Sequence, residues 1–225
     1  MSKQTTELTN LDPRIKQFQS DIRAKFAVEN KSIKKGQIVF VGSSLMEIFP
    51  IEKMQKEKKL GLEKIIYNRG IRATTTADLL AHIDLQIFDL KPSKIFINIG
   101  SNDIGFNVPE NTYLSNYDEI FRQIKEKLPN TEVYALAYYP MNAVYNFGEE
   151  KHEHASMFAT RSNDDFAKMS EKVAALAQKH NYQFINVNAN LADENGNLRP
   201  ELTFDGVHML PAGYEIVLKN LMKYL

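Results

Sequence analysis

The sequence predicts an α/β fold in which a five-stranded parallel sheet lies between two layers of helices. Short, nearly continuous apolar segments recur along the chain, rich in β-branched and aromatic residues. Strands that are buried on both faces have this character. Segments with apolar residues at helical spacing separate them. The alternation of strand and helix favours a parallel sheet that is covered on both faces.

The expected elements follow in order along the 225 residues. Asp12-Pro13 is a typical helix start, and the apolar residues after it predict a helix over 12–30. Strands are predicted within segments 37–42, 64–70, 94–103, 132–140 and 182–188. Further helices are predicted at 77–90, 117–128, 164–180 and from residue 211 to the end of the chain. Residues 141–163 lack a clear period, which predicts a binding loop, a lid or a disordered piece at the edge of a cleft.

The composition restricts the classes of function. A chain of this length favours one domain over residues 1–225. The 28 Lys and Arg residues balance the 28 Asp and Glu residues, so no overall charge attracts nucleic acid or an anionic membrane. The absence of cysteine excludes disulfides, thiol nucleophiles and cysteine-ligated metals. A polar start and the lack of a membrane-length apolar run predict a cytoplasmic protein without a membrane span.

Polar residues gather where the predicted strands end. Gly42-Ser43-Ser44 follows the first strand, Gly70 the second, and Gly100-Ser101-Asn102-Asp103 the third. Asp205-Gly206-Val207-His208 lies well after the fifth. Ligands of open parallel sheets bind outside the carboxyl ends of the strands. These four clusters are therefore expected at one edge of the sheet.

The side chains in these clusters suit ester hydrolysis by a serine. This reaction needs a hydroxyl, an imidazole that takes its proton, and a carboxylate that fixes the imidazole tautomer. In one tight turn, Asp205 reaches Nδ1 of His208 and leaves Nε2 free. The reaction also needs donors to the oxyanion. Gly70 allows a backbone N–H to approach a ligand closely, the Asn102 amide is a neutral donor, and Ser44 presents its own N–H at a helix start.

In their order and placement, the four clusters resemble the blocks of the SGNH hydrolases, also called GDSL esterases and lipases. "NRGIRATTTADLL" resembles the second block of the platelet-activating-factor acetylhydrolase-like branch. The resemblance runs from about residue 37 to the end. It implies a three-layer α/β/α, flavodoxin-like fold with Ser44 as nucleophile and His208 as its base. It further implies that Asp205 orients the histidine and that Ser44, Gly70 and Asn102 form the oxyanion hole.

The sequence departs from the family pattern at Ser43, which stands where the family has an aspartate. This position does not perform the acyl transfer, so the change concerns local hydrogen bonds, and Ser43 is expected to bond nearby backbone. Residues 42–46, Gly-Ser-Ser-Leu-Met, also lack the second glycine of the α/β-hydrolase nucleophile elbow, so that motif does not match.

The resemblance implies hydrolysis of carboxylic esters through an acyl-enzyme, with no metal and no organic cofactor. Short-acyl or O-acetyl esters are expected, and lysophospholipids and thioesters stay open. Two alternatives are acyl transfer to a sugar or another alcohol, and ligand binding without catalysis. The expected partner is a small-molecule ester rather than nucleic acid, and a homodimer is one option for the oligomeric state.

Four residues are candidate substrate contacts at the cleft edge: Arg72, Phe106, Tyr139 and Arg161. His152 and His154 are two residues apart, whereas zinc peptidases place their paired histidines four apart on a helix. This histidine pair is interpreted as part of a solvated loop or, at most, as a substrate contact.

Overall fold

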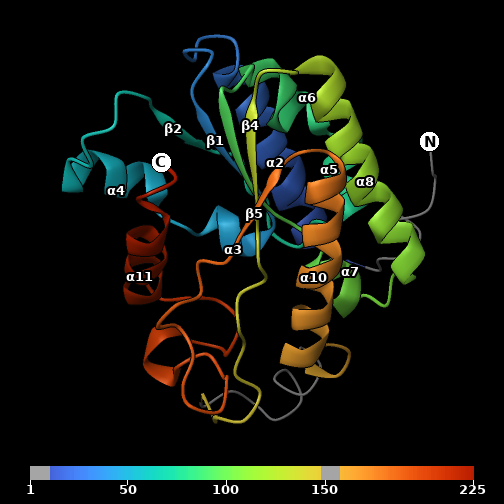
Figure 1. Cartoon of the computed structure of the whole chain (residues 1–225), viewed down its shortest axis with the longest axis vertical. Helices are drawn as coiled ribbons and strands as arrows, with labels where there is room; N and C mark the ends of the chain where they lie inside the picture. The colour runs from blue at the N-terminus through green and yellow to red at the C-terminus, as the bar shows by residue number, and fades with distance from the viewer. Residues whose placement is uncertain (1–10, 148–157) are drawn as a thin grey trace.

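The computed structural model describes residues 11–147 and 158–225, and its centre is a five-stranded sheet (Figure 1). The strands are β1 (Ile38–Gly42), β2 (Ile66–Asn68), β3 (Lys94–Asn98), β4 (Glu132–Leu136) and β5 (Gln183–Ile185). All pair in parallel, in the order β2-β1-β3-β4-β5. The predicted α/β class, the parallel sheet and the flavodoxin-like order are confirmed, and each strand lies within its predicted segment.

Helices cover both faces of this sheet, as Figure 1 shows with α4 and α11 on one side and α8 and α10 on the other. The first layer contains α3 (Ser44–Glu47), α4 (Ile51–Lys58) and α11 (Pro211–Leu221). The second contains α5 (Thr76–Ala81), α6 (Ile83–Gln86), the 3-10 helix η1 (Phe88–Leu90), α8 (Glu110–Lys127) and α10 (Asn163–Lys179). The N-terminal helix α2 (Pro13–Glu29) lies against α6. Two short helices, α7 (Ser101–Gly105) and η2 (Pro200–Leu202), complete the described elements.

An aromatic ladder fills the face of the sheet beneath α4 and α11. Phe40 of β1, Phe96 of β3 and Tyr134 of β4 are paired in register. Their rings stack with centroids 4.8 and 5.0 Å apart. Because successive strand residues point to opposite faces, this ladder leaves the other face to different side chains.

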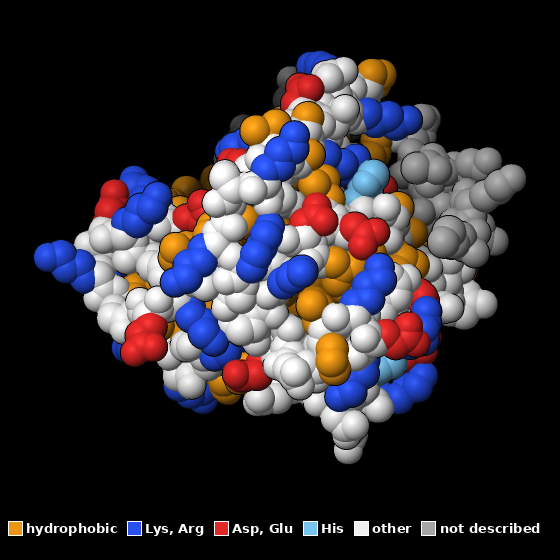
Figure 2. All heavy atoms as spheres, turned by 90° about the horizontal axis from the view of Figure 1, so that it is seen from above, with side chains coloured by type: hydrophobic (Ala, Val, Ile, Leu, Met, Phe, Trp, Pro, Cys, Tyr) orange, Lys and Arg blue, Asp and Glu red, His pale blue; other side chains and the backbone are white. Residues whose placement is uncertain are grey.

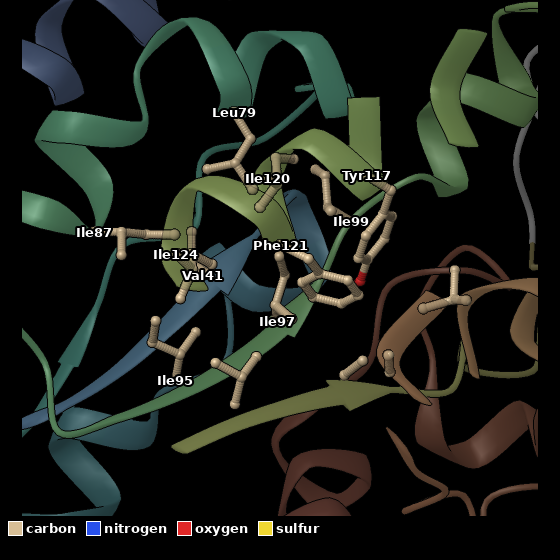
Figure 3. Close-up of a cluster of buried hydrophobic side chains, with 14 of the residues drawn as sticks. Val41, Leu79, Ile87, Ile95, Ile97, Ile99, Tyr117, Ile120, Phe121 and Ile124 are labelled. Carbon is tan, nitrogen blue, oxygen red and sulfur yellow. The ribbon is translucent and has the colours of Figure 1, made fainter. Parts of the chain in front are cut away.

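Aliphatic side chains cover that other face. Figure 3 shows Ile95 and Ile97 of β3 beneath Ile120, Phe121 and Ile124 of α8, and all five are fully buried. Burial of such side chains stabilises a fold by roughly 1.5–3 kcal/mol each relative to exposure. The two apolar layers enclose the sheet on both faces.

The predicted helix over 77–90 is divided in the structure. The chain leaves helical geometry at His82 (φ −121°) and at Ile87 (φ −130°), which separates α5, α6 and η1. Each of the three short pieces still buries apolar side chains against the same core layer. The apolar spacing therefore correctly predicts a face that packs against the core, but it does not predict the bends at His82 and Ile87.

Two other helices, α8 and α4, also differ from expectation, whereas α3 agrees with it. The predicted helix over 117–128 begins earlier, at Glu110. Its first three residues are polar, and the buried Tyr113 extends the apolar face one turn ahead of Tyr117. The short helix α3 begins at Ser44, which confirms the helix start predicted there. Helix α4 was not predicted, since Ile51 and Met54 are its only buried residues.

The surface carries charges of both signs. Figure 2 shows Lys and Arg side chains interspersed with Asp and Glu side chains over the face seen from above. This distribution agrees with the formal net charge of zero. In the parts of the chain that the structure describes, no helix combines the length and the apolar character that crossing a bilayer requires.

Candidate active site

Three side chains form a hydrogen-bonded row where β1 ends. Ser44 is the first residue of α3, directly after the strand. Its Oγ lies 2.9 Å from Nε2 of His208, and Nδ1 of His208 lies 2.5 Å from Oδ2 of Asp205. The structure thus brings together the three residues that the sequence selected from opposite ends of the chain.

A closed turn holds the Asp205 carboxylate. Its Oδ1 accepts the N–H groups of Val207 (2.9 Å) and His208 (2.7 Å), while Oδ2 faces the imidazole. Thr203 stabilises the same turn, because its hydroxyl donates to the His208 carbonyl at 2.7 Å and accepts the Gly206 N–H at 2.9 Å. These bonds leave the carboxylate and the imidazole little freedom to rotate.

The protonation of this pair follows from its hydrogen bonds. Burial acts to raise the pKa of Asp205, but the hydrogen bonds and the charge of His208 outweigh it, and the pKa lies below its ordinary value. An ionised carboxylate only accepts hydrogen bonds, so Nδ1 of His208 carries a proton. In the neutral imidazole, Nε2 is then the acceptor for the Ser44 hydroxyl. This is the state in which histidine acts as a base.

A cavity of about 540 Å³ opens over Ser44 and His208. Its walls are mixed, with apolar side chains from several elements and cationic side chains between them. Lining residues outside the row include Ile15, Ile48, Arg72, Ala73, Asn102, Phe106, Arg161 and Phe204. The ring of Phe204 is 52% exposed and stacks on His208, with centroids 5.8 Å apart and planes at 13°.

Three of the four candidate substrate contacts, Arg72, Phe106 and Arg161, line this cavity. The guanidinium of Arg72 forms an ion pair with Glu47. Burial lowers the pKa of Arg161, and the negative charge of Asp205 opposes this effect. Both cations therefore have charged neighbours at the site.

Tyr139 does not line the cavity, and its prediction as a substrate contact is corrected. Its side chain is 2% exposed and lies in the core layer that contains α11. It borders a separate hollow next to β5 instead. Tyr138 and Tyr139 come shortly after β4. Successive side chains point to opposite faces, so Tyr138 packs in the core layer of α8 and α10 and Tyr139 in the layer of α11.

Gly70 also lies outside the cavity, which corrects its predicted role as an oxyanion donor. Its N–H donates to Oδ1 of Asn68 at 2.9 Å, and the residue borders a hollow between α2 and α4. The glycine is needed for packing, because a Cβ there would lie 2.3 Å from the backbone nitrogen of Glu47 in α3. The missing side chain therefore serves close approach to a helix rather than to a ligand.

Ala73 is a cavity residue that the sequence did not reveal. It has a left-handed backbone conformation, with φ of +56°, and borders the cavity together with Ser44 and Asn102. Among residues 11–147 and 158–225, no group accepts its N–H. A left-handed conformation is uncommon outside glycine, and apart from the small side chain the sequence carries no signal for it.

Two further donors border the same space. Asn102 gives one amide hydrogen to the Thr74 carbonyl at 2.9 Å, and a second hydrogen remains on its nitrogen. The N–H of Ser44 belongs to the first turn of α3 and has no intrahelical partner. Ser43 is 1% exposed, and its side chain makes no capping hydrogen bond to α3.

Metal-ligating groups do not gather elsewhere in the described chain. Across residues 11–147 and 158–225, no three His, Asp or Glu side chains are arranged to hold an ion. Of the predicted irregular segment over 141–163, His152 and His154 lie outside the described residues.

Comparison with known proteins relates the chain to ester hydrolases. A model of the GDSL-like lipase/acylhydrolase family matches residues 55–216, a segment that includes Asn102, Asp205 and His208 and begins after Ser44. A curated isoamyl acetate-hydrolyzing esterase from Saccharomyces cerevisiae is 25% identical over 130 residues. The match covers 57% of this chain and 55% of the yeast protein, so the chain spans about half the length of that relative.

Solved structures share the fold. One from Streptococcus pneumonia, described provisionally as a platelet activating factor, is 32% identical with a TM-score of 0.80, and the alignment covers 93% of this chain and 94% of that one. An acetylxylan esterase from Geobacillus stearothermophilus, solved as a catalytic variant, is 18% identical with a TM-score of 0.60. Here 85% of this chain and 94% of the other are covered, and at this identity the likeness concerns the fold.

Proposed function

This chain belongs to the GDSL-like lipase/acylhydrolase family, and we propose that it hydrolyses short-acyl carboxylic esters through an acyl-enzyme on Ser44. The observation that carries the proposal is the hydrogen-bonded row of Ser44, His208 and Asp205 beneath an open cavity. A nucleophile, its base and an orienting carboxylate are the parts that acyl transfer by serine requires.

In the first half of the reaction, Ser44 Oγ attacks the ester carbonyl carbon while its proton passes to Nε2 of His208. Asp205 stabilises the imidazolium that forms, because its carboxylate is ionised and bonded to Nδ1. When the tetrahedral intermediate collapses, the carbon–oxygen bond to the alcohol breaks. His208 returns the proton to the departing alkoxide, and the acyl group stays on Ser44.

In the second half, a water molecule gives its proton to His208 and attacks the acyl carbon. Collapse of this second intermediate breaks the bond to Ser44, whose oxygen regains the proton. The products are a carboxylic acid and an alcohol, and the site returns to its starting state. Each proton that moves is held by Nε2 of His208, which is within hydrogen-bond distance of Ser44 Oγ.

The oxyanion of both intermediates needs donors that are already oriented. We assign this role to the N–H groups of Ser44 and Ala73 and to the free amide hydrogen of Asn102. All three residues border the cavity. Ala73 replaces Gly70 in this assignment, because the Gly70 N–H is donated to Asn68.

The preference for short acyl groups rests on the mixed walls of the cavity. Arg72, Arg161 and Asn102 alternate with apolar side chains, and a long alkyl chain would remove these polar groups from water without replacing their hydrogen bonds. The yeast relative is named for hydrolysis of an acetate ester, and the Geobacillus structure is an acetylxylan esterase. The name of the yeast relative supports an acetyl or similarly short ester as the substrate of this chain.

Activity-based labelling combined with an ester panel tests this function. A fluorophosphonate should modify Ser44, as mapped by mass spectrometry, and p-nitrophenyl acetate should be hydrolysed with higher kcat/KM than the decanoate. Ser44→Ala should lose roughly three to six orders of magnitude in kcat, as nucleophile deletions do, with Tm close to the parent. The matched control is Ser43→Ala, which should retain activity. An adduct on Ser43, or full activity in Ser44→Ala, would contradict the mechanism.

A further inference from the structure

We propose that Gln19 of the N-terminal helix α2 is a positioning residue for the oxyanion hole. It acts on the peptide unit that joins Arg72 to Ala73. The inference rests on the proposed function, because it assigns a task to a side chain that does not itself border the reacting atoms. It makes α2 part of the catalytic apparatus rather than only a cover for the fold.

The contact that carries the proposal is a single hydrogen bond. Nε2 of Gln19 donates to the carbonyl oxygen of Arg72 at 2.8 Å. Gln19 is 4% exposed, although it lies on a helix whose other residues are mostly exposed. A buried amide must find hydrogen-bond partners or lose stability, so the Arg72 carbonyl accounts for the burial of Gln19.

The carbonyl of Arg72 and the N–H of Ala73 belong to one planar peptide unit. The described chain contains no cis peptide bonds, so these two groups point in opposite directions. A donor that holds the carbonyl therefore directs the Ala73 N–H away from Gln19. Ala73 borders the cavity over Ser44, and its N–H has no acceptor in the described chain. Hydrogen bonding to the carbonyl also polarises the N–H of the same unit.

This peptide needs to be held, because Ala73 has an unfavourable backbone conformation. A left-handed conformation is unfavourable for an L-residue other than glycine, because its Cβ lies too close to the following carbonyl oxygen, and φ of Ala73 is +56°. Rotation of the peptide unit would relieve this cost and turn the N–H out of the cavity. The bond from Gln19 opposes that rotation, since it would be broken by it.

The other side of Arg72 is fixed by the helix that carries the nucleophile. The Arg72 N–H donates to Oε2 of Glu47 at 2.6 Å, and the guanidinium pairs with the same carboxylate. Phe18 of α2 lies beneath that guanidinium, 4.2 Å from its carbon to the ring centroid. The backbone of Arg72 is thus held through its N–H by α3 and through its carbonyl by α2.

The test uses two variants of the full chain. Gln19→Met keeps the length of the side chain and has no donor, and Gln19→Glu is assayed at alkaline pH, where an ionised carboxylate only accepts hydrogen bonds. Hydrolysis of p-nitrophenyl acetate and binding of 1-butaneboronic acid are measured, since the tetrahedral boronate on Ser44 places an oxygen in the oxyanion position. We expect kcat to fall roughly 10- to 100-fold, as for small misplacements of a catalytic group. The Kd for the boronic acid should rise by a similar factor, and KM should stay close to the parent value.

The matched control is Gln17→Ala, because Gln17 is exposed on the same helix and bonds only Asp21 among the described residues. It should leave kcat and the boronic acid Kd unchanged. The proposal is overturned if both Gln19 variants keep the kcat and the Kd of the parent. It is also overturned if kcat falls while Kd stays unchanged. Partial unfolding lowers the apparent kcat but not the Kd, so that result would reflect lost folded protein rather than a displaced oxyanion donor. Fluorophosphonate labelling of Ser44 in the parent separates these outcomes from failure of the proposed function, in which Ser44 is not labelled.

Discussion

Two adjacent serines have different environments because the chain changes conformation between them. Ser43 is extended, with φ −90° and ψ −152°, and its side chain is buried. Ser44 begins α3, so its side chain takes a different direction and meets the imidazole of His208. The backbone itself thus selects which hydroxyl reaches the base, and the proposed nucleophile follows from that geometry.

At the same scale, Asn102→Ala should lower kcat by about 10²–10³, the usual cost of removing one oxyanion donor. The Asn102 amide is proposed to bond the oxyanion, which develops in the transition state and is absent from the bound ester, so KM should change much less. Steady-state kinetics with p-nitrophenyl acetate check this split. An effect mainly on KM would instead make Asn102 a substrate-binding residue. Asn102→Ala also removes the hydrogen bond to the Thr74 carbonyl, and a measurement of Tm shows how much stability this loss costs.

At the scale of elements, the turn between η2 and α11 positions His208, the proposed base. Gly206 lies between Asp205 and His208 with φ of +86°. A Cβ at this glycine would lie 2.3 Å from the carbonyl oxygen of Asn142, whose N–H in turn donates to the Gly206 carbonyl. The turn therefore depends on a close contact with the segment after β4, far away in the sequence.

Gly206→Ala should lower both activity and stability. The clash with Asn142 displaces the turn, and displacement of about 1 Å at a catalytic group typically costs roughly 10²-fold in rate. The control is Gly196→Ala, because Gly196 has a similar φ of +81° and open space around its Cβ position. Both variants carry the conformational cost, so kinetics and thermal unfolding should show reduced kcat in Gly206→Ala alone. Equal kcat in the two variants would mean that the contact does not position the site.

Strands were easier to predict than helices in this chain. The β-branched and aromatic strands are buried on both faces, so their sequences differ clearly from their surroundings. Helix α4 buries only Ile51 and Met54, and α8 has three polar residues before the buried Tyr113, so the apolar signal at both starts is short. The spacing of apolar residues indicates which side chains face the core. Helix ends depend on backbone geometry, which this spacing does not indicate.

At the scale of the whole molecule, a buried carboxyl group links three helices. Asp103 of α7 accepts the Thr76 N–H at 2.9 Å and the Thr76 hydroxyl at 2.6 Å. Asn116 of α8 donates to the same hydroxyl at 3.3 Å. Burial raises the pKa of Asp103 from 3.8 to about 7, although the bonds from Thr76 act to lower it. Between about pH 4 and pH 7, the folded chain therefore holds a proton on Asp103 that the unfolded chain has released.

This proton makes global stability depend on pH. As pH rises from about 4 to about 7, the unfolded state loses the Asp103 proton while the folded state keeps it, so the parent loses stability. Each unit of pKa difference corresponds to about 1.4 kcal/mol. Asp103→Asn lacks this contribution, so its Tm relative to the parent should rise across that interval and level off above it.

Thermal unfolding of both proteins at several pH values between 4 and 8 checks this expectation. Asp205, whose lowered pKa produces the opposite trend at lower pH, is present in both proteins, so its contribution cancels in the difference. A Tm difference that stays constant over the whole interval would show that Asp103 is ionised in the folded chain.

The sequence by itself determined the fold class, the strand positions and the choice of Ser44, His208 and Asp205 as candidates. These features depend on local sequence. A buried strand is a run of consecutive apolar residues, and each polar cluster is a short segment of neighbouring residues. The tertiary structure decided that Ala73 and not Gly70 faces the cavity and that Gln19 holds the adjoining carbonyl. The direction of a peptide N–H depends on backbone dihedrals and on partners from distant segments, and residue type alone encodes neither.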